Sequence, residues 1–317
     1  MSPGGELRWR TQRLARRLRR VACSHLYRDA RRDIRCTALL AGTARSGTTW
    51  LAEALASQQP CRVMFEPFNP RKVRAYARYQ YFQYMRPETP DPDLRAYCES
   101  LFTGDIRHPW IDREVDVLRP RFRLVKEIRA NLMLGWIRRE FPEIPVLLLL
   151  RHPCAVVASR LRLAWATDTD IASFREQPAL IVDHLAGRMQ LIDSAHSDEE
   201  KHAIIWCISN LVPLAQLGAG ALTILHYEEL CVRPHEEIGR AVAALGFPRS
   251  LQSIDVLGSP SMTTRRGSAV VSGDDRLSAW TRILSPMQVR KVLDVVDAFG
   301  LTHLYGESTM PLPRAFA

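Results

Sequence analysis

The stretch LLAGTARSGTTWL, residues 39–51, constrains the fold more than any other part of the sequence. An apolar run leads into two glycines spaced G-x-x-x-x-G, and a helical pattern follows, as in a phosphate-binding loop. Thr49 stands where such a loop carries its Ser or Thr, but Thr48 replaces the usual lysine. The stretch is therefore either a strand that ends in a glycine turn or a cradle for a phosphate group other than that of ATP.

Five apolar runs predict buried parallel strands, because a turn or a helix start follows each of them. They are residues 37–41, 62–65, 122–128, 146–150 and 222–225. Helical patterns alternate with these runs, at residues 48–57, 132–141, 155–162, 178–192, 203–217 and 235–245. This alternation predicts the α/β class, with a P-loop-like, doubly wound parallel sheet flanked by helices in a single domain.

We expect a domain of residues 36–305 followed by a tail of residues 306–317. Within it, residues 70–120 are rich in Tyr, Arg and Pro and predict an insertion over the sheet edge that shapes a substrate pocket. A surface helix that uses its tyrosines for packing is an equal alternative. Residues 258–276 are rich in Gly, Ser and Thr, which is typical of a lid or of a plain linker.

The net charge of +10 is concentrated at the N-terminus. Residues 1–35 contain 11 arginines and three acidic residues, a net charge of +8, so the rest of the chain carries only +2. We expect a helical extension there, solvated and partly frayed, and we expect no nucleic-acid partner. A basic amphipathic helix on an anionic membrane surface is the alternative, which would give peripheral contact with the inner membrane surface.

The remaining composition is typical of a cytoplasmic protein. The longest aliphatic run, residues 146–150, is far shorter than the roughly 18 residues of a membrane-spanning helix. The N-terminus lacks the apolar core and the cleavage site of a secretory signal. The seven cysteines include no C-x-x-C pair, so we expect reduced thiols, with no zinc site and no disulfide framework.

The glycine loop would form an anion site. A strand, a tight turn and a helix start bring backbone N–H groups and the positive end of a helix to one place. Arg45, Thr48 and Thr49 would add charged and hydroxyl donors to the same anion. A glycine turn without a ligand is the alternative.

The second informative segment is LLLLRHPCAVVASRL, residues 147–161. Its strand brings Arg151 to the carboxyl edge of the sheet, where ligands bind in such folds, so Arg151 is placed to hold a second anion. Ser159 lies about two turns into the following helix. A structural ion pair is the alternative role for Arg151.

Together, GTARSGTTWL and RHPCAVVASRL closely resemble the sulfotransferases that use 3′-phosphoadenosine-5′-phosphosulfate (PAPS). FEPF and LVKEIR, residues 65–68 and 124–129, resemble segments of the carbohydrate-type branch. LHYEELCVRP at residues 225–234 and the segment at residues 277–301 resemble two further family segments. The resemblance covers residues 36–305 and is weakest over residues 70–120. The family usually reads R-D-P where this chain has His152 after Arg151.

The resemblance implies the donor site. The first loop would cradle the 5′-phosphosulfate, and the residues concerned are Arg45, Ser46, Gly47, Thr48, Thr49 and Trp50. Arg151 and Ser159 would bind the 3′-phosphate. Tyr227 would contact the adenine, although a packing role in the core is nearly as good an interpretation. Ser268 would belong to a lid over the nucleotide.

The chemistry needs positive charge and a base. Sulfuryl transfer spreads negative charge between a leaving oxygen and an attacking oxygen in line with it, and Arg45 and Lys126 would neutralise that charge without a metal. Glu66 is our candidate for the base that accepts the proton of the acceptor hydroxyl. There are three alternatives. Glu66 caps a helix or forms an ion pair, Lys126 forms an ion pair with Glu127 or Glu66, or His152 is the base.

The sequence therefore predicts a PAPS-dependent sulfotransferase that acts on a hydroxyl acceptor, a saccharide or a glycoconjugate such as a glycolipid. A P-loop-type small-molecule kinase using ATP is disfavoured because Thr48 replaces the loop lysine and no acidic metal-binding strand end is evident. A binding module without catalysis is the third reading. Trp206 and Asn210 are interpreted as core residues.

Overall fold

The computed structural model describes residues 19–218, 220–247 and 275–313. Its centre is a sheet of parallel strands in the order β2-β3-β1-β4-β5. The strands are β1 (Thr37–Gly42), β2 (Cys61–Phe65), β3 (Phe122–Lys126), β4 (Val146–Leu150) and β5 (Thr223–His226). The predicted α/β class is confirmed, and each strand lies within two residues of its predicted bounds.

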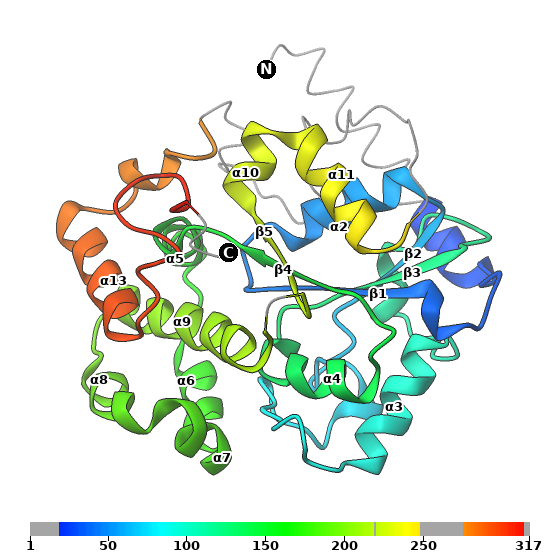
Figure 1. Cartoon of the computed structure of the whole chain (residues 1–317), viewed down its shortest axis with the longest axis horizontal. Coiled ribbons are helices and arrows are strands. Elements are labelled where there is room, and N and C mark those ends of the chain that lie inside the picture. The colour runs from blue at the N-terminus through cyan, green and yellow to red at the C-terminus, as the bar shows by residue number, and fades with distance from the viewer. Residues whose placement is uncertain (1–18, 219, 248–274, 314–317) are drawn as a thin grey trace.

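Helices cover both faces of this sheet (Figure 1). α2, α10 and α11 lie on one face, and α4, α5 and α9 lie on the other. The helices are α2 (Thr48–Gln58), α3 (Pro92–Phe102), α4 (Leu134–Glu140), α5 (Pro153–Leu161), α6 (Asp168–Arg175), α7 (Pro178–Leu180), α8 (Met189–Ser194), α9 (Asp198–Gln216), α10 (Tyr227–Val232), α11 (Pro234–Ala244) and α13 (Pro286–Ala298).

The central strand β1 is apolar on both faces because it is buried on both. Leu39 and Ala41 belong to the core under α4 and α9, whereas Ala38 and Leu40 belong to the core under α2 and α11. This is the alternation that a two-sided parallel sheet requires. All carboxyl ends of the strands therefore meet at one edge, where the loops that follow them come together.

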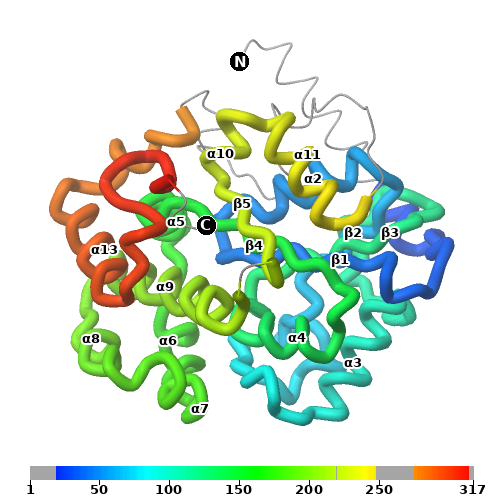
Figure 2. The backbone as a smooth tube through the Cα atoms, in the orientation of Figure 1, coloured from blue at the N-terminus to red at the C-terminus, as the bar shows by residue number. Residues whose placement is uncertain are grey.

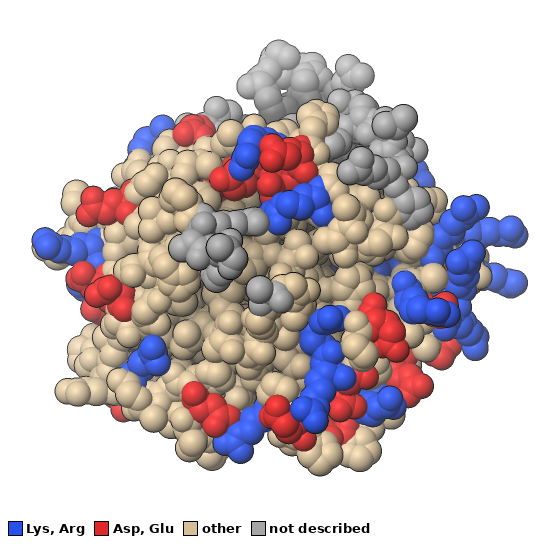
Figure 3. Space-filling view, viewed as in Figure 1, with Lys and Arg blue, Asp and Glu red and all other residues tan. Residues whose placement is uncertain are grey.

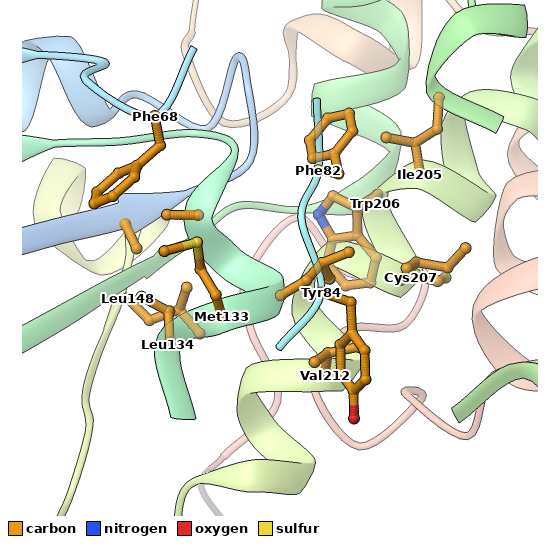
Figure 4. Close-up of a cluster of buried hydrophobic side chains, with 14 of the residues drawn as sticks. Phe68, Phe82, Tyr84, Met133, Leu134, Leu148, Ile205, Trp206, Cys207 and Val212 are labelled. Atoms are coloured by element: carbon orange, nitrogen blue, oxygen red, sulfur yellow. The ribbon is translucent and has the colours of Figure 1, made fainter. Parts of the chain in front are cut away.

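The larger core contains aromatic side chains from distant segments (Figure 4). Phe82 and Tyr84 from the 70–120 segment pack with Trp206 and Val212 of α9 and with Met133. Trp206 and Asn210 are fully buried, so their interpretation as core residues is confirmed. The indole N–H of Trp206 also donates to the carbonyl of Arg151, at 3.0 Å, which ties this core to the end of β4.

The 70–120 segment contains α3 and short turns of 3-10 helix. Tyr76 and Tyr97 are buried and pack edge to face against Phe68, and Tyr79 stacks on Tyr76. The segment therefore has a packing role. Tyr81 instead reaches toward the strand ends, where its hydroxyl accepts a hydrogen bond from Arg129.

One predicted helix is wrong, and one observed helix was not expected from the sequence. Residues 178–192 are not one helix, because π and 3-10 turns at 181–188 separate α7 from α8. Gly187 weakens the helix there, and the Asp183 side chain is held by Tyr84 and Arg86. α6 was not predicted, because its short sequence is mostly polar and buries only Ile171, Ser173 and Phe174.

The described part of the N-terminal segment packs against the domain. Residues 19–26 are helical, and Tyr27 is fully buried. Arg20 forms ion pairs with Glu53 of α2 and with Glu114, and its own side chain is buried. Residues 19–26 are therefore an ordered helix anchored by buried side chains rather than a frayed one, while most of the remaining side chains of residues 19–35 are solvated as expected. Residues 1–18 lie outside the described part.

Exposed basic side chains gather at the edge of the molecule where the N-terminal segment meets the β2 side of the sheet (Figure 3). Arg28, Arg31, Arg32 and Arg35 are exposed in this segment. In the residues that the structure describes, no helix has the length and apolar character needed to cross a bilayer.

Arg62 holds this N-terminal segment to the sheet, and its removal should destabilise the fold. Its buried guanidinium pairs with Asp29 at 2.8 Å and with Asp112 at 2.8 Å. Arg62→Met leaves the buried carboxylate of Asp112 without its ion pair and leaves Asp29 only a longer pair with Arg123, at 3.9 Å, so the free energy of unfolding should fall by about 3–5 kcal/mol in urea titrations. Arg78→Met breaks the exposed pair with Asp93, which solvent screens, and should leave the free energy of unfolding nearly unchanged. Equal losses in the two variants would contradict this assignment.

Candidate active site

The loop between β1 and α2 depends on two close backbone approaches. A Cβ atom at Gly42 would lie 2.7 Å from the carbonyl oxygen of Leu149 on β4. A Cβ atom at Gly47 would lie 2.7 Å from the ring of Tyr227, and Gly47 has a φ of +102°. Arg45 also has a positive φ, of 77°. The two glycines let the loop lie directly against the ends of β4 and β5, in the strained conformation of a tight turn.

The loop has the donor groups of an anion site. The first N–H groups of α2 have no partner within the helix, and the positive end of the helix dipole lies with them. The hydroxyl of Ser46 is fully buried and contacts no hydrogen-bond partner in the part of the chain that the structure describes. A buried hydroxyl without a partner is costly, so this cradle fits an oxyanion ligand.

The structure brings the predicted basic residues together at this loop. The Nε of Arg45 donates to the Oγ of Ser159 at 3.0 Å. The Nη1 of Arg151 donates to the carbonyl of Arg45 at 3.1 Å. The guanidinium carbon of Arg151 lies 4.2 Å from the centre of the Tyr227 ring. Residues from β1, β4, α5 and α10 thus form one cationic cluster.

Tyr227 and Trp50 form an aromatic wall beside the cluster. Their ring centroids are 5.6 Å apart, and both side chains are buried. Burial raises the pKa of Tyr227 to about 12, so its hydroxyl stays neutral. Thr48 is buried and Thr49 is half-buried in the first turn of α2. The predicted lid residue Ser268 lies outside the described residues.

Arg160 is a further cation at the loop, and the sequence analysis missed it. Its Nε and Nη2 donate to the carbonyl of Ala44 at 3.3 and 3.2 Å. Burial lowers the pKa of Arg160 to about 10, although the negative charge of Asp170 opposes this shift. Its place next to Ser159 in ASRL was the only signal in the sequence.

His152 has a structural role that uses both ring nitrogens. Nδ1 accepts from the backbone N–H of Cys154 and caps α5, which fixes the proton on Nε2, where it meets the carbonyl of Gly306 at 3.0 Å. The ring stacks on Trp280 with centroids 4.7 Å apart. Figure 2 shows the C-terminal segment after α13 returning to lie beside α5. This buried imidazole is therefore committed to capping and packing.

Glu66 lies at the end of β2 in a network of ion pairs. One carboxylate oxygen accepts from Lys126 at 2.6 Å, and the other accepts from Arg129 at 2.6 Å. Burial raises the pKa of Glu66, but the two cations outweigh burial and hold the pKa below its ordinary value of 4.5. Its φ of +45° is unusual for a residue with a side chain. The Glu66–Lys126 ion pair that the sequence left as an alternative is thus present.

Arg129 and Glu127 complete this network. The sequence analysis assigned Arg129 no role and offered Glu127 only as an alternative ion-pair partner of Lys126, whose partner is Glu66. The guanidinium of Arg129 bridges Glu66 and the hydroxyl of Tyr81, which it meets at 2.7 Å. The buried carboxylate of Glu127 accepts from the backbone N–H groups of Phe68, Ile128 and Arg129. Glu127 therefore shapes the two turns that position Glu66 and Arg129. Their adjacency in LVKEIR was the available signal.

The chain resembles known proteins over most of its length. The model of the family described as Sulfotransferase family matches residues 38–250. Nodulation protein NoeE of Sinorhizobium fredii (strain NBRC 101917 / NGR234) is 27% identical over 292 residues, which cover 87% of this chain and 67% of that protein.

Among solved structures, the sulfotransferase domain from the curacin biosynthetic pathway is 16% identical, with a TM-score of 0.45 and coverage of 87% of this chain and 99% of that one. The sulfotransferase domain of the Synechococcus PCC 7002 olefin synthase is 16% identical, with a TM-score of 0.44 and coverage of 83% and 94%. Mouse sulfotransferase SULT7A1, complexed with PAP, is 15% identical, with a TM-score of 0.42 and 86% coverage of each chain.

The stability of the fold should depend on pH through His152. Burial lowers the pKa of His152 from 6.5 to about 4, so the unfolded chain takes up a proton below pH 6.5 that the folded chain refuses. The free energy of unfolding should therefore fall by about 3 kcal/mol between pH 6.5 and pH 4 through this residue. His152→Asn keeps a side-chain acceptor for the Cys154 N–H and should remove this part of the dependence. Urea unfolding of the wild type and of His152→Asn at pH 7 and pH 4 tests this prediction. An equal fall in the free energy of unfolding of the two proteins would contradict it.

Proposed function

The chain belongs to the sulfotransferase family, and from this premise we propose that it transfers the sulfuryl group of PAPS to a hydroxyl of a saccharide or glycoconjugate. The observation that carries the proposal is the contact of Arg45 with both Ser159 and Arg151 at the glycine loop. Three residues assigned to the donor from separate segments meet at one place. The family match at residues 38–250 also lies within the proposed domain of residues 36–305.

The residues present fit an anionic nucleotide donor. In this proposal the loop from Arg45 to Trp50 holds the 5′-phosphosulfate with backbone N–H groups and with the otherwise unpartnered hydroxyl of Ser46. Arg151 and Ser159 hold the 3′-phosphate. The wall formed by Trp50 and Tyr227 lies beside these groups and supports an adenine contact at Tyr227. PAPS supplies the activated sulfur when it is bound.

The reaction exchanges one sulfur–oxygen bond for another. The bond from sulfur to the 5′-phosphate oxygen breaks while the bond from sulfur to the acceptor oxygen forms, and the acceptor proton passes to the Glu66 carboxylate. The lowered pKa of Glu66 keeps that carboxylate ionised at neutral pH, as a proton acceptor must be. Lys126 and Arg45 offset the negative charge of the transferring group. Arg129 holds Glu66 in place.

The kinase alternative has no support in these residues. ATP chemistry of this loop type uses a loop lysine and a metal held by the loop hydroxyl and an acidic partner. Thr48 stands in the lysine position, and β4 ends in Arg151 and His152. Saccharide specificity rests on the resemblance of FEPF and LVKEIR to the carbohydrate-type branch.

Donor binding is tested with variants of α5 and of the turn between β4 and α5. Arg151→Ala removes a charged donor and should weaken binding of 3′-phosphoadenosine 5′-phosphate (PAP) about 10- to 150-fold, and Ser159→Ala should weaken it about 2- to 12-fold. Arg162→Ala, at an exposed position just after the same helix, is the control and should leave the affinity unchanged. Isothermal titration calorimetry with PAP measures all three. Wild-type affinity in Arg151→Ala would exclude the proposed donor site.

The role of Glu66 is tested by turnover. Glu66→Gln should lower kcat for sulfuryl transfer about 10²- to 10⁴-fold and leave PAP affinity nearly unchanged. Glu140→Gln on α4 is the matched control and should keep full turnover. Because the pKa of Glu66 lies below 4.5, wild-type kcat should not decline between about pH 8 and pH 5 through this group. Full turnover in Glu66→Gln would mean that another group is the base.

A further inference from the structure

A cavity of about 250 Å³ lies between α2, β2 and the N-terminal segment. Thr49 and Lys126 line it, so it reaches both the first turn of the donor-loop helix and the end of β3. α2 lines one side of it with Ala56, β2 lines the floor with Val63 and Phe65, and the N-terminal segment lines the other side with Arg19 and Arg20. The cavity therefore adjoins the proposed reaction centre on the side away from Arg151 and Ser159.

The outer face of α2 leaves this space open. Ala52, Glu53 and Ala56 follow Thr49 by three, four and seven residues, so the four share one face of the helix. Two of them are alanines, whose small side chains leave room beside the apolar wall of Val63 and Phe65.

The N-terminal segment closes the opposite side. Arg20 is fixed by its ion pairs with Glu53 and Glu114, the first at 3.4 Å. The Nε of Arg19 donates to the backbone carbonyl of Asp116 at 2.9 Å. Arg19 and Arg20 lie before the family match, which begins at residue 38. The cavity is thus completed by a part of the chain that the family model does not include.

The charges of the lining are balanced. Arg19, Arg20 and Lys126 carry three positive charges, and Glu53, Glu114 and Asp116 carry three negative charges. An anionic ligand would gain no net attraction here, and a purely apolar ligand would leave these groups without water. A neutral ligand with many hydroxyls can donate to carboxylate oxygens and accept from guanidinium groups, while its C–H face lies against the apolar wall.

We propose that this cavity is an acceptor subsite that binds one neutral sugar unit, with the N-terminal helix as a specificity element. The inference rests on the proposed sulfuryl transfer, because it assigns the acceptor side of that same centre. The volume is below the roughly 300–1,000 Å³ of pockets that enclose drug-sized ligands, so it suits a single sugar ring with the rest of the acceptor outside.

The test fills the cavity without touching the donor loop. Ala56→Trp places a large side chain in the cavity, and Asp116→Ala removes one acceptor without filling it. Ala96→Trp, at an exposed position of α3 that does not line the cavity, is the matched control. The probes are maltotetraose, cellotetraose and N-acetyllactosamine, with a heparin tetrasaccharide as the anionic comparison. Saturation-transfer NMR of the full chain with PAP measures binding, and mass spectrometry of PAPS reactions measures sulfated product.

We expect a neutral saccharide to bind the wild type, with binding weakened about ten-fold or more in Ala56→Trp and about three-fold or more in Asp116→Ala. Ala96→Trp should bind like the wild type, and PAP affinity should stay within about two-fold in every variant. Unchanged saccharide binding in both cavity variants, preference for the anionic probe, or no saccharide binding at all overturns the subsite. Failure of the wild type to bind PAP or to form any sulfated product would instead overturn the proposed function.

Discussion

The position of β1 between β3 and β4 is the constraint on which the site depends. β1 is hydrogen-bonded to both neighbours in parallel, so its glycine loop emerges between the two strand ends. β3 brings Lys126 to one side of the loop, and β4 brings Arg151 to the other. The close approach of Gly42 to the carbonyl of Leu149 leaves no room for a side chain, which holds the loop down against β4. A sulfuryl donor would therefore span from the β4 side to the β3 side across the loop.

Two kinds of arginine environment distinguish the scaffold from the site. Arg62 and Arg20 are paired with carboxylates within the protein, so their charge is already compensated. Arg160 is buried and Arg151 is half-buried, and both contact backbone carbonyls instead. Their carboxylate neighbours, Asp170 for Arg160 and Glu228 for Arg151, lie beyond ion-pair distance within the described ranges. A cation taken out of water without a close ion pair is costly, and an anionic ligand would offset part of that cost. The electrostatics of the loop therefore favour the state with an anion bound.

The sequence could predict the strands and site residues that depend on local residue patterns. The apolar runs located all five strands, and the spacing of the glycine loop, Arg151 and Ser159 identified residues that do meet in space. It could not predict contacts that depend on tertiary packing, such as the pairing of Arg62 with Asp29 or the burial of Tyr27. α9 begins earlier than the apolar pattern indicated, because a capping box of Ser197 and Glu200 starts the helix.

His152 illustrates the same limit in a single side chain. A histidine beside an arginine that is expected to bind phosphate is a reasonable candidate base when only the sequence is known. Its role is decided by groups far away in the chain: the carbonyl of Gly306, the ring of Trp280, and Glu228, which accepts the backbone N–H of His152 at 2.9 Å. Both ring nitrogens are used, so the residue has no lone pair or proton left for chemistry in this arrangement.

The coupling between Glu66 and its two cations has a consequence for any mechanism at this centre. A carboxylate held by Lys126 and Arg129 is ionised but weakly basic, because each hydrogen bond from a cation stabilises the charged form. In the proposed mechanism Lys126 donates to both Glu66 and the transferring group, so a stronger contact with a sulfuryl oxygen would leave the carboxylate more basic. Glu66 and Lys126 are in direct contact, so we expect that the effects of changing each of them will not add. Arg129, which also contacts Tyr81 of the 70–120 segment, would keep Glu66 in place.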